Sequence, residues 1–288
     1  MCVCSTKQSA VAQQNSLPLK SETCDKHRDA TFKIKRLSNQ SAHNKLIVAL
    51  DVPTVDEARA SFRALREVVG MFKIGSQLFT AAGPDFVREI VKAGGRVFLD
   101  LKFHDIPNTV AAACREATRL GVSMLNVHAS GGGEMLRRAV ADVAEVSEKE
   151  SLQHPTLLAV TVLTSMNAAA LAETGVASNI ESQVTALANL AHQSGMNGVV
   201  ASPHEVGFIR GQIPAREFVI VTPGVRPRNA SSDDQRRVMT PAEAIRAGAD
   251  YLVVGRAILN AKEPLRAAQD IIAEMQQALV EYNNGATH

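Results

Sequence analysis

Two charged residues, Asp100 and Lys102, end an apolar run in the segment FLDLKFHDIPNT, residues 98–109. In an extended strand, side chains two positions apart point to the same face, so both residues share a face with Phe98. Burying two opposite charges at a strand end costs free energy, which favours a functional role for the pair. A fixed carboxylate can repel a substrate anion, and a fixed ammonium can protonate a carbanion.

Eight short apolar runs follow residue 44, and they are near-continuous rather than alternating, as in parallel strands buried on both faces. The runs cover residues 45–51, 71–75, 96–102, 124–129, 157–163, 198–202, 218–225 and 251–258. Amphipathic stretches that suit helices lie between them, at 55–69, 85–93, 110–120, 134–147, 180–194 and 240–247. This alternation predicts eight strand–helix units.

Eight such units predict an α/β fold of the (β/α)8 TIM-barrel type, as a single domain over residues 45–288. That length is close to the roughly 250 residues usual for this barrel. An open doubly wound sheet is the alternative, but it requires a glycine fingerprint after the first strand. The segment ALDVPTVDEA at 49–58 contains no glycine. The barrel is therefore favoured.

Residues 1–44 differ in composition, since they are rich in Ser, Gln, Lys and Asn and show no clear periodicity. They predict a polar, basic N-terminal extension that is disordered or loosely attached. Cys2 and Cys4 lack further ligands, so we interpret them as incidental rather than as a metal site. The four cysteines form no disulfide framework, which indicates a reducing cytoplasm.

The composition excludes two classes of partner. The net charge of +2 is too near neutral to indicate a nucleic-acid surface. No stretch approaches eighteen continuous apolar residues, which argues against a membrane span. With no tryptophan and 4% aromatic residues, the core must be built mainly from aliphatic side chains.

Polar residues follow the predicted strands where a TIM barrel carries its chemistry, at the carboxyl ends. They are Asp51, Lys73, Asp100 with Lys102, His128, Thr164, Arg226, Gly255 and Arg256. Two lysines and two carboxylates at one mouth would alternate in sign, so that each keeps its neighbours ionised.

Some of these residues have a simpler interpretation. Asp105 could cap the helix that Pro107 begins, and Lys73 could extend its ammonium from a strand end to solvent. We interpret His104 as a loop residue and His128 as a packed or loop-supporting residue.

The segment FLDLKFHDIPNTV resembles the signature of the orotidine 5′-phosphate decarboxylase family, which makes UMP in pyrimidine synthesis. Seven further segments are similar to the family's and follow its order: VALD at 48–51, FKIG at 72–75, NVHASGG at 126–132, AVTVLTSM at 159–166, VTPGVRP at 221–227, DQRRVMTP at 234–241 and VVGRAI at 253–258. The resemblance covers essentially all of 45–260, and only the first 44 residues fall outside it.

The resemblance implies catalytic roles at the third strand and its neighbours. Lys102 would donate a proton to C6 of the pyrimidine, and Asp100 would sit against the departing carboxylate. Lys73 would bridge Asp100 and the ribose, whose hydroxyls Asp51 would hold. Asp105 would act in the active site of the second subunit.

The resemblance also implies the remaining substrate contacts and a homodimer with shared active sites. Thr109, like Asp105, would reach the site from the neighbouring subunit, and Thr164 would contact the substrate. The phosphate would be held by Gln235, Arg226, Gly255 and Arg256.

Loss of CO₂ leaves an electron pair at C6 that the ring cannot delocalise, so stabilisation must be electrostatic. The sequence shows no cofactor motif, and the family needs neither cofactor nor metal. An alternative is a Mg²⁺-dependent sugar-phosphate decarboxylase or aldolase of the same superfamily, but FKIGSQ at 72–77 lacks its acidic ligand. A non-catalytic nucleotide-binding scaffold is the other alternative, which the intact Asp100, Lys102 and Asp105 disfavour.

Overall fold

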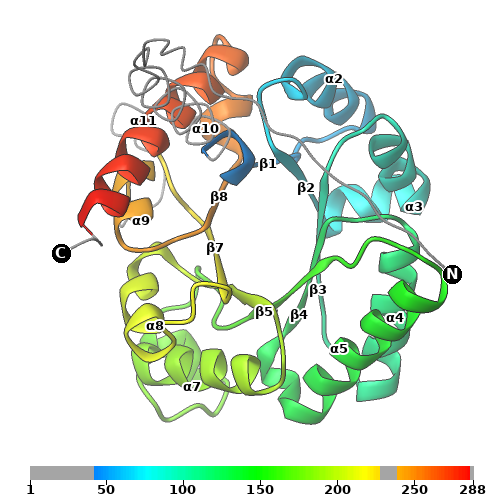
Figure 1. Ribbon diagram of the computed structural model, residues 1–288, viewed down its shortest axis with the longest axis vertical. Coiled ribbons are helices and arrows are strands. Elements are labelled where there is room, and N and C mark those ends of the chain that lie inside the picture. Colours follow the sequence, from blue (N-terminus) through cyan, green and yellow to red (C-terminus); the bar gives the residue numbers. More distant parts are fainter. Residues whose placement is uncertain (1–41, 228–238, 286–288) are drawn as a thin grey trace, which may run out of the picture. The chain divides into compact units, whose positions relative to one another are not determined.

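The computed structural model describes residues 42–227 and 239–285, which form a closed barrel of eight parallel strands surrounded by helices (Figure 1). The strands follow one another in chain order, and β8 pairs with β1 to close the ring. They are β1 (Leu46–Ala49), β2 (Met71–Gly75), β3 (Val97–Phe103), β4 (Met124–His128), β5 (Thr156–Val160), β6 (Gly198–Val200), β7 (Val219–Pro223) and β8 (Tyr251–Val254). Each overlaps a predicted strand, and the predicted (β/α)8 barrel is confirmed.

The helices lie outside the ring of strands. They are α2 (Val55–Leu65), α3 (Ser76–Lys92), α4 (Pro107–Arg119), α5 (Gly132–Lys149), α6 (Ala168–Glu173), α7 (Ile180–Gln193), α8 (Val206–Gln212), α9 (Pro241–Arg246), α10 (Arg256–Leu259) and α11 (Pro264–Gly285), with 3₁₀ turns η1 (Ala129–Gly131) and η2 (Pro203–Glu205). All six predicted helical stretches overlap a helix. Within the described ranges, none of the helices combines the length and apolar character that a membrane crossing requires.

The strands separate two apolar layers. The inner layer fills the barrel and consists of Ile47, Ala49, Met71, Phe98, Met124, Leu158, Val160, Val200, Val221 and Val253. The outer layer packs between strands and helices and includes Val97 and Leu99. Phe98 thus points inward while its neighbours point outward, and the same alternation directs Asp100 into the barrel.

β3 becomes irregular where it carries the charged pair. Its register with β4 shifts between Leu99 and Phe103. Lys102 adopts φ = +51°, in the left-handed region that a lysine seldom occupies. Such a conformation costs on the order of 1–3 kcal/mol and persists only where the surrounding structure holds it. The backbone at the end of β3 therefore sets the direction of the Lys102 side chain and does not continue regular pairing with β4.

Candidate active site

Four charged side chains form a continuous chain of ion pairs at the carboxyl ends of β1, β2 and β3. Lys73 Nζ lies 2.9 Å from Asp51 Oδ1 and 3.4 Å from Asp100 Oδ2. Lys102 Nζ lies 2.6 Å from Asp100 Oδ1. The four charges therefore alternate in sign along the chain, with the Asp100 carboxylate between two ammonium groups.

The Asp100 side chain, like that of Lys73, is largely buried, with 12% of its surface exposed against 10% for Lys73. Burial is the largest influence on its pKa and raises it, because a buried carboxylate loses hydration. The charges of Lys73 and Lys102, with hydrogen bonds from Lys102 and Asn126, outweigh burial and bring the pKa below its usual value. Asp100 is thus a buried carboxylate that remains ionised at neutral pH.

Lys73 comes from β2, where Met71 belongs to the inner layer and Lys73 follows it on the same face. Gly75 leaves room for its ammonium. A Cβ at residue 75 would lie 3.0 Å from Lys73 Nζ and 3.4 Å from Asp51 Oδ1. The glycine of the FKIG segment therefore permits the close approach of this ion pair.

Asn126 is a site residue that sequence reasoning missed. It is fully buried in β4, and its side chain hydrogen-bonds both Asp100 and the backbone of Lys102. A signal was present, because the alternation in MLNVH places Asn126 on the face of Met124, which is inside the barrel. A buried polar residue on that face requires partners.

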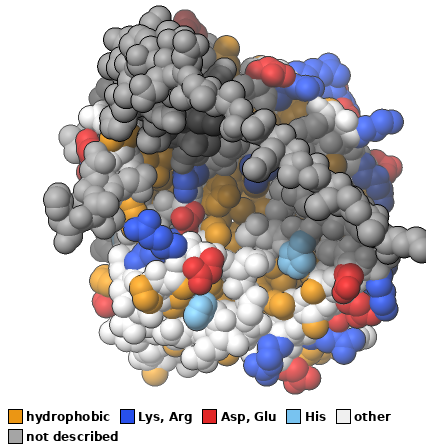
Figure 2. Space-filling model, in the orientation of Figure 1, with side chains coloured by type: hydrophobic (Ala, Val, Ile, Leu, Met, Phe, Trp, Pro, Cys, Tyr) orange, Lys and Arg blue, Asp and Glu red, His pale blue; other side chains and the backbone are white. Residues whose placement is uncertain are grey.

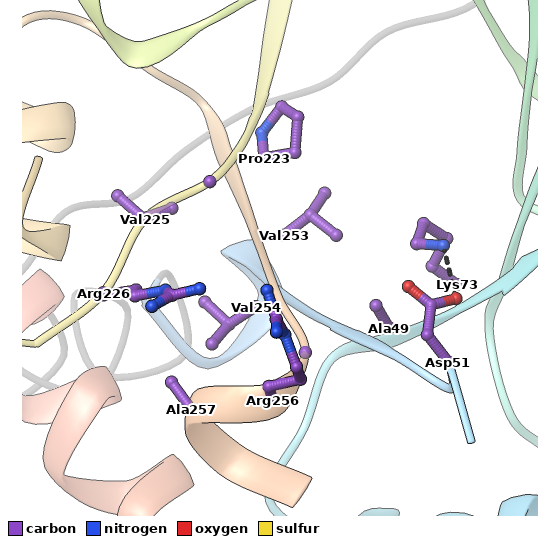
Figure 3. Close-up of a pocket in the computed structure, with 12 residues that line it drawn as sticks. Ala49, Asp51, Lys73, Pro223, Val225, Arg226, Val253, Val254, Arg256 and Ala257 are labelled. Atoms are coloured by element: carbon purple, nitrogen blue, oxygen red, sulfur yellow. Dashed lines mark hydrogen bonds and ion pairs between the residues drawn. The ribbon is translucent and has the colours of Figure 1, made fainter. Parts of the chain in front are cut away.

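A pocket of about 260 Å³ opens beside the ion pairs. Its lining is Ala49, Asp51, Lys73, Pro223, Gly224, Val225, Arg226, Val253, Val254, Gly255, Arg256 and Ala257. Figure 3 shows Arg226 and Arg256 on one side of the pocket and the Asp51–Lys73 pair on the other. In Figure 2, the face in view has a hollowed centre with hydrophobic side chains at its depth and charged side chains around it. One end of the pocket can therefore hold an anion, while the other offers a carboxylate and an ammonium.

The structure brings only part of the predicted set to this pocket. Asp105, Thr109 and Thr164 are exposed, and none of them is among its lining residues. Gln235 lies outside the described residues. The pocket and the adjoining ion pairs thus unite seven of the eleven predicted residues, which are Asp51, Lys73, Asp100, Lys102, Arg226, Gly255 and Arg256.

Asp105 does not cap α4, contrary to the simpler interpretation. The N-cap is Ile106, and α4 has no side-chain cap hydrogen bond. Asp105 Oδ1 instead accepts the Ile106 backbone N–H at 2.6 Å. The capping alternative is wrong because the helix begins one residue later than an Asp105 cap would require.

His104, in the loop after β3, and His128, at the end of β4, lie against each other. The rings of His104 and His128 have centroids 5.3 Å apart. Burial is the main cause that lowers the pKa of His128, and the charges of His104 and Lys102 lower it further. His104 is exposed, whereas His128 is half-buried. His128 is therefore a packed neighbour of the charged residues, as we interpreted it.

Known proteins are similar to this chain in sequence and in fold. A model of the family described as "Orotidine 5'-phosphate decarboxylase / HUMPS family" matches residues 44–271. An orotidine 5′-phosphate decarboxylase of Moorella thermoacetica is 52% identical over 244 residues, 84% of this chain and 96% of the relative. Another, of Syntrophotalea carbinolica, is 55% identical over 240 residues, 83% of this chain and 98% of the relative.

Solved structures agree with these relatives. The crystal structure of orotidine 5′-phosphate decarboxylase from Lactobacillus acidophilus superposes with a TM-score of 0.71 at 35% identity, covering 80% of this chain and 98% of the other. The resemblance drawn from the motifs is confirmed: the chain belongs to the orotidine 5′-phosphate decarboxylase / HUMPS family.

Proposed function

We propose that this chain is an orotidine 5′-phosphate decarboxylase, which converts its substrate to UMP and CO₂. The two relatives above carry that name, and this chain matches almost their full length. The observation that carries the proposal is the alternating chain of Asp51, Lys73, Asp100 and Lys102 beside a pocket with two arginines. This arrangement suits a substrate with a phosphate at one end and a carboxylate at the reacting end.

The phosphate is proposed to bind to Arg226 and Arg256, with the backbone at Gly255 and the side chain of Gln235 as further donors. Guanidinium groups suit phosphate because they form charge-assisted, bidentate hydrogen bonds. This end of the pocket follows β7 and β8, where TIM barrels commonly bind phosphate. Binding energy from a phosphate remote from the reacting carbon can be realised in the transition state.

The ribose and the reacting carbon are proposed to lie toward the ion pairs. Asp51 and Lys73 hold the ribose hydroxyls, and Thr164 adds a substrate contact. The Asp100 carboxylate, ionised and buried, faces the substrate carboxylate and disfavours its negative charge. That repulsion is relieved as the carboxylate departs as neutral CO₂.

The bond changes follow from these positions. The bond between C6 and the carboxylate breaks, CO₂ leaves, and the electron pair stays on C6. The Lys102 ammonium transfers a proton to C6, which forms the C6–H bond of UMP, and the neutral amine regains a proton from solvent. The two ammonium groups stabilise the developing charge, so we expect turnover without an added metal or cofactor.

We also propose that the enzyme works in the cytoplasm as a homodimer with shared active sites. Asp105 and Thr109 are exposed on their own chain, and between them Ile106 is 67% exposed. An exposed apolar side chain beside two predicted catalytic contacts suits a subunit interface. Among the described residues Cys114 is a buried free thiol, which is consistent with a reducing compartment.

The function is tested by mixing the protein with orotidine 5′-phosphate and EDTA, following the pyrimidine absorbance and identifying the product. We expect stoichiometric UMP in EDTA, and no product above background from Lys102→Ala. Turnover of a sugar phosphate that requires Mg²⁺, with none of orotidine 5′-phosphate, would establish the metal-dependent alternative. Tight UMP binding without any turnover would establish the scaffold.

A further inference from the structure

Asn126 on β4 contacts both members of the charged pair on β3. Its Oδ1 accepts the Lys102 backbone N–H at 2.8 Å, and its Nδ2 donates to Asp100 Oδ1 at 2.7 Å. The residue is 0% exposed. Both ends of one buried amide are therefore occupied by the two residues that the proposed mechanism uses most.

The contact with the Lys102 N–H lies where the pairing of β3 with β4 is irregular. Pairing of β3 with β4 is regular at Leu99 and resumes only at Phe103 after a shift of register. Within this interval the Asn126 side chain accepts a hydrogen bond from the Lys102 backbone N–H. Lys102 has the left-handed φ of +51° at this point. The amide thus holds the backbone conformation that directs the lysine side chain.

The contact with Asp100 fixes the carboxylate. Oδ1 of Asp100 receives both Lys102 Nζ, at 2.6 Å, and Asn126 Nδ2, at 2.7 Å. Oδ2 faces Lys73 Nζ at 3.4 Å. A donor held by the rigid strand prevents the carboxylate from rotating about its bond to Cβ, and each of its oxygens keeps a defined partner.

We propose that Asn126 is a positioning residue for the decarboxylation: it sets both the direction of Lys102 and the orientation of the Asp100 carboxylate. This inference rests on the proposed function. Asn126 is buried beneath the charged pair, so it acts through those two residues and not by touching the substrate. Its effect is confined to the reacting end, because the phosphate-binding arginines come from the opposite side of the pocket.

A positioning role and a purely structural role predict different kinetics for Asn126→Ala. If Asn126 positions the pair, kcat falls by about 100-fold or more, because the acid and the carboxylate are both displaced. KM and the affinity for UMP stay within about threefold, since the phosphate and ribose contacts are kept. The acidic limb of the pH profile moves to higher pH, because Asp100 loses a donor to its ionised form.

Asn197→Ala is the control for the loss of a hydrogen bond from a strand N–H to an asparagine side chain, at a residue that is exposed rather than buried. Asn197 Oδ1 also accepts a strand N–H, that of Leu157 at 2.8 Å, at the start of β5 and away from the charged residues. Its loss should lower the thermal midpoint and leave kcat and the pH profile unchanged.

Asn126→Asp provides a second variant with a distinct signature, useful if the alanine variant does not fold. Ionised, the new carboxylate still accepts the Lys102 N–H but repels Asp100. When one proton is shared between the two carboxyls, their net charge returns to that of the wild type and a donor is restored. Its activity relative to wild type should therefore rise as pH falls from 8 to 6.

These measurements test the positioning role of Asn126 separately from the proposed decarboxylase function. The inference is overturned if folded Asn126→Ala keeps kcat within about threefold and an unshifted pH profile, or if the relative activity of Asn126→Asp is flat with pH. A wild-type protein that forms no UMP overturns the proposed function instead.

Discussion

Lys102 Nζ lies 2.6 Å from Oδ1 of Asp100, two residues earlier on the same strand. In a regular strand, side chains two residues apart are separated by about 6–7 Å along the strand. Lys102 has a left-handed rather than an extended backbone, and its long side chain reaches Asp100 to form an ion pair within one strand end. Lys102, the proton donor of the proposed mechanism, is therefore held against the Asp100 carboxylate, whose negative charge favours the protonated form of the lysines beside it.

The ionised state of Asp100 links this ion pair to stability. Its pKa is lowered in the folded protein, so its ionisation stabilises the fold above the unfolded-state pKa, and this contribution is lost as pH falls through the folded pKa. Asp100→Asn should therefore be less stable than wild type at pH 7. The difference should shrink on acidification toward pH 2. Urea unfolding at several pH values measures both quantities, and a difference that does not change with pH would contradict this assignment.

Glu205, at the end of η2, should show the opposite dependence. Burial raises its pKa to about 7, although the Ser202 N–H partly opposes the shift. Between the ordinary pKa of 4.5 and about 7, the folded state keeps a proton that the unfolded state has released, so stability falls as pH rises. Glu205→Gln should be more stable than wild type at pH 8 by roughly 2–3 kcal/mol and equal to it near pH 4.

The same unfolding series on Glu173→Gln is the control for Glu205, because Glu173 is an exposed glutamate of α6. That variant should follow wild type at every pH. If Glu205→Gln also follows wild type, Glu205 does not hold a proton in the folded state.

The sequence predicted the barrel because parallel strands buried on both faces leave a strong pattern of apolar runs. It also predicted Asp100 and Lys102, since paired charges at a strand end are conspicuous. The shift of register after Leu99 was not predictable, because it depends on pairing with β4, which is distant in sequence. Asn126 carried a signal, as a polar residue on the inward face of β4, but its two partners lie on the neighbouring strand and could not be identified from the sequence.

Further differences between prediction and structure have other causes. The short helices α6 and α8 span only six and seven residues, too few for a helical period to be recognised. Asp105, Thr109 and Thr164 were assigned by resemblance, and a single chain does not gather them at the pocket. The roles of Asp105 and Thr109 remain predictions that concern the assembled enzyme, and the role of Thr164 remains a prediction of a substrate contact.

We propose that residues 1–41 are not needed for folding or turnover. Their composition shows no core-forming pattern, and the family match begins at residue 44. Deleting residues 1–41 should leave kcat and the thermal midpoint nearly unchanged.

Extending the deletion through residue 44 is the informative comparison. Ala42 is fully buried, and His43 donates a hydrogen bond to the Val68 carbonyl. The longer deletion should therefore lower the thermal midpoint. A large loss of activity from the shorter deletion would contradict a dispensable extension.

Asp105 is predicted to act across the subunit boundary. Lys102→Ala and Asp105→Ala, each inactive, are mixed under conditions that allow subunit exchange. A heterodimer then has one site with both defects and one intact site. Activity should reach about a quarter of wild type, because half of the dimers are mixed and each has one intact site.

Lys102→Ala mixed with Lys73→Ala is the matched control. Both lysines belong to the site of their own chain, so each site of the heterodimer keeps a defect and no activity should return. If exchange is verified independently and the first mixture also stays inactive, Asp105 serves its own chain.

The central claim is that the Lys102 ammonium supplies the proton to C6. The most direct measurement is the turnover number of folded Lys102→Ala with orotidine 5′-phosphate, with Lys149→Ala as control, because Lys149 is an exposed lysine of α5. We predict that Lys102→Ala retains a native near-ultraviolet spectrum and UMP binding but loses at least about a thousandfold in kcat, whereas Lys149→Ala matches wild type. A folded Lys102→Ala that decarboxylates at close to the wild-type rate would contradict the account.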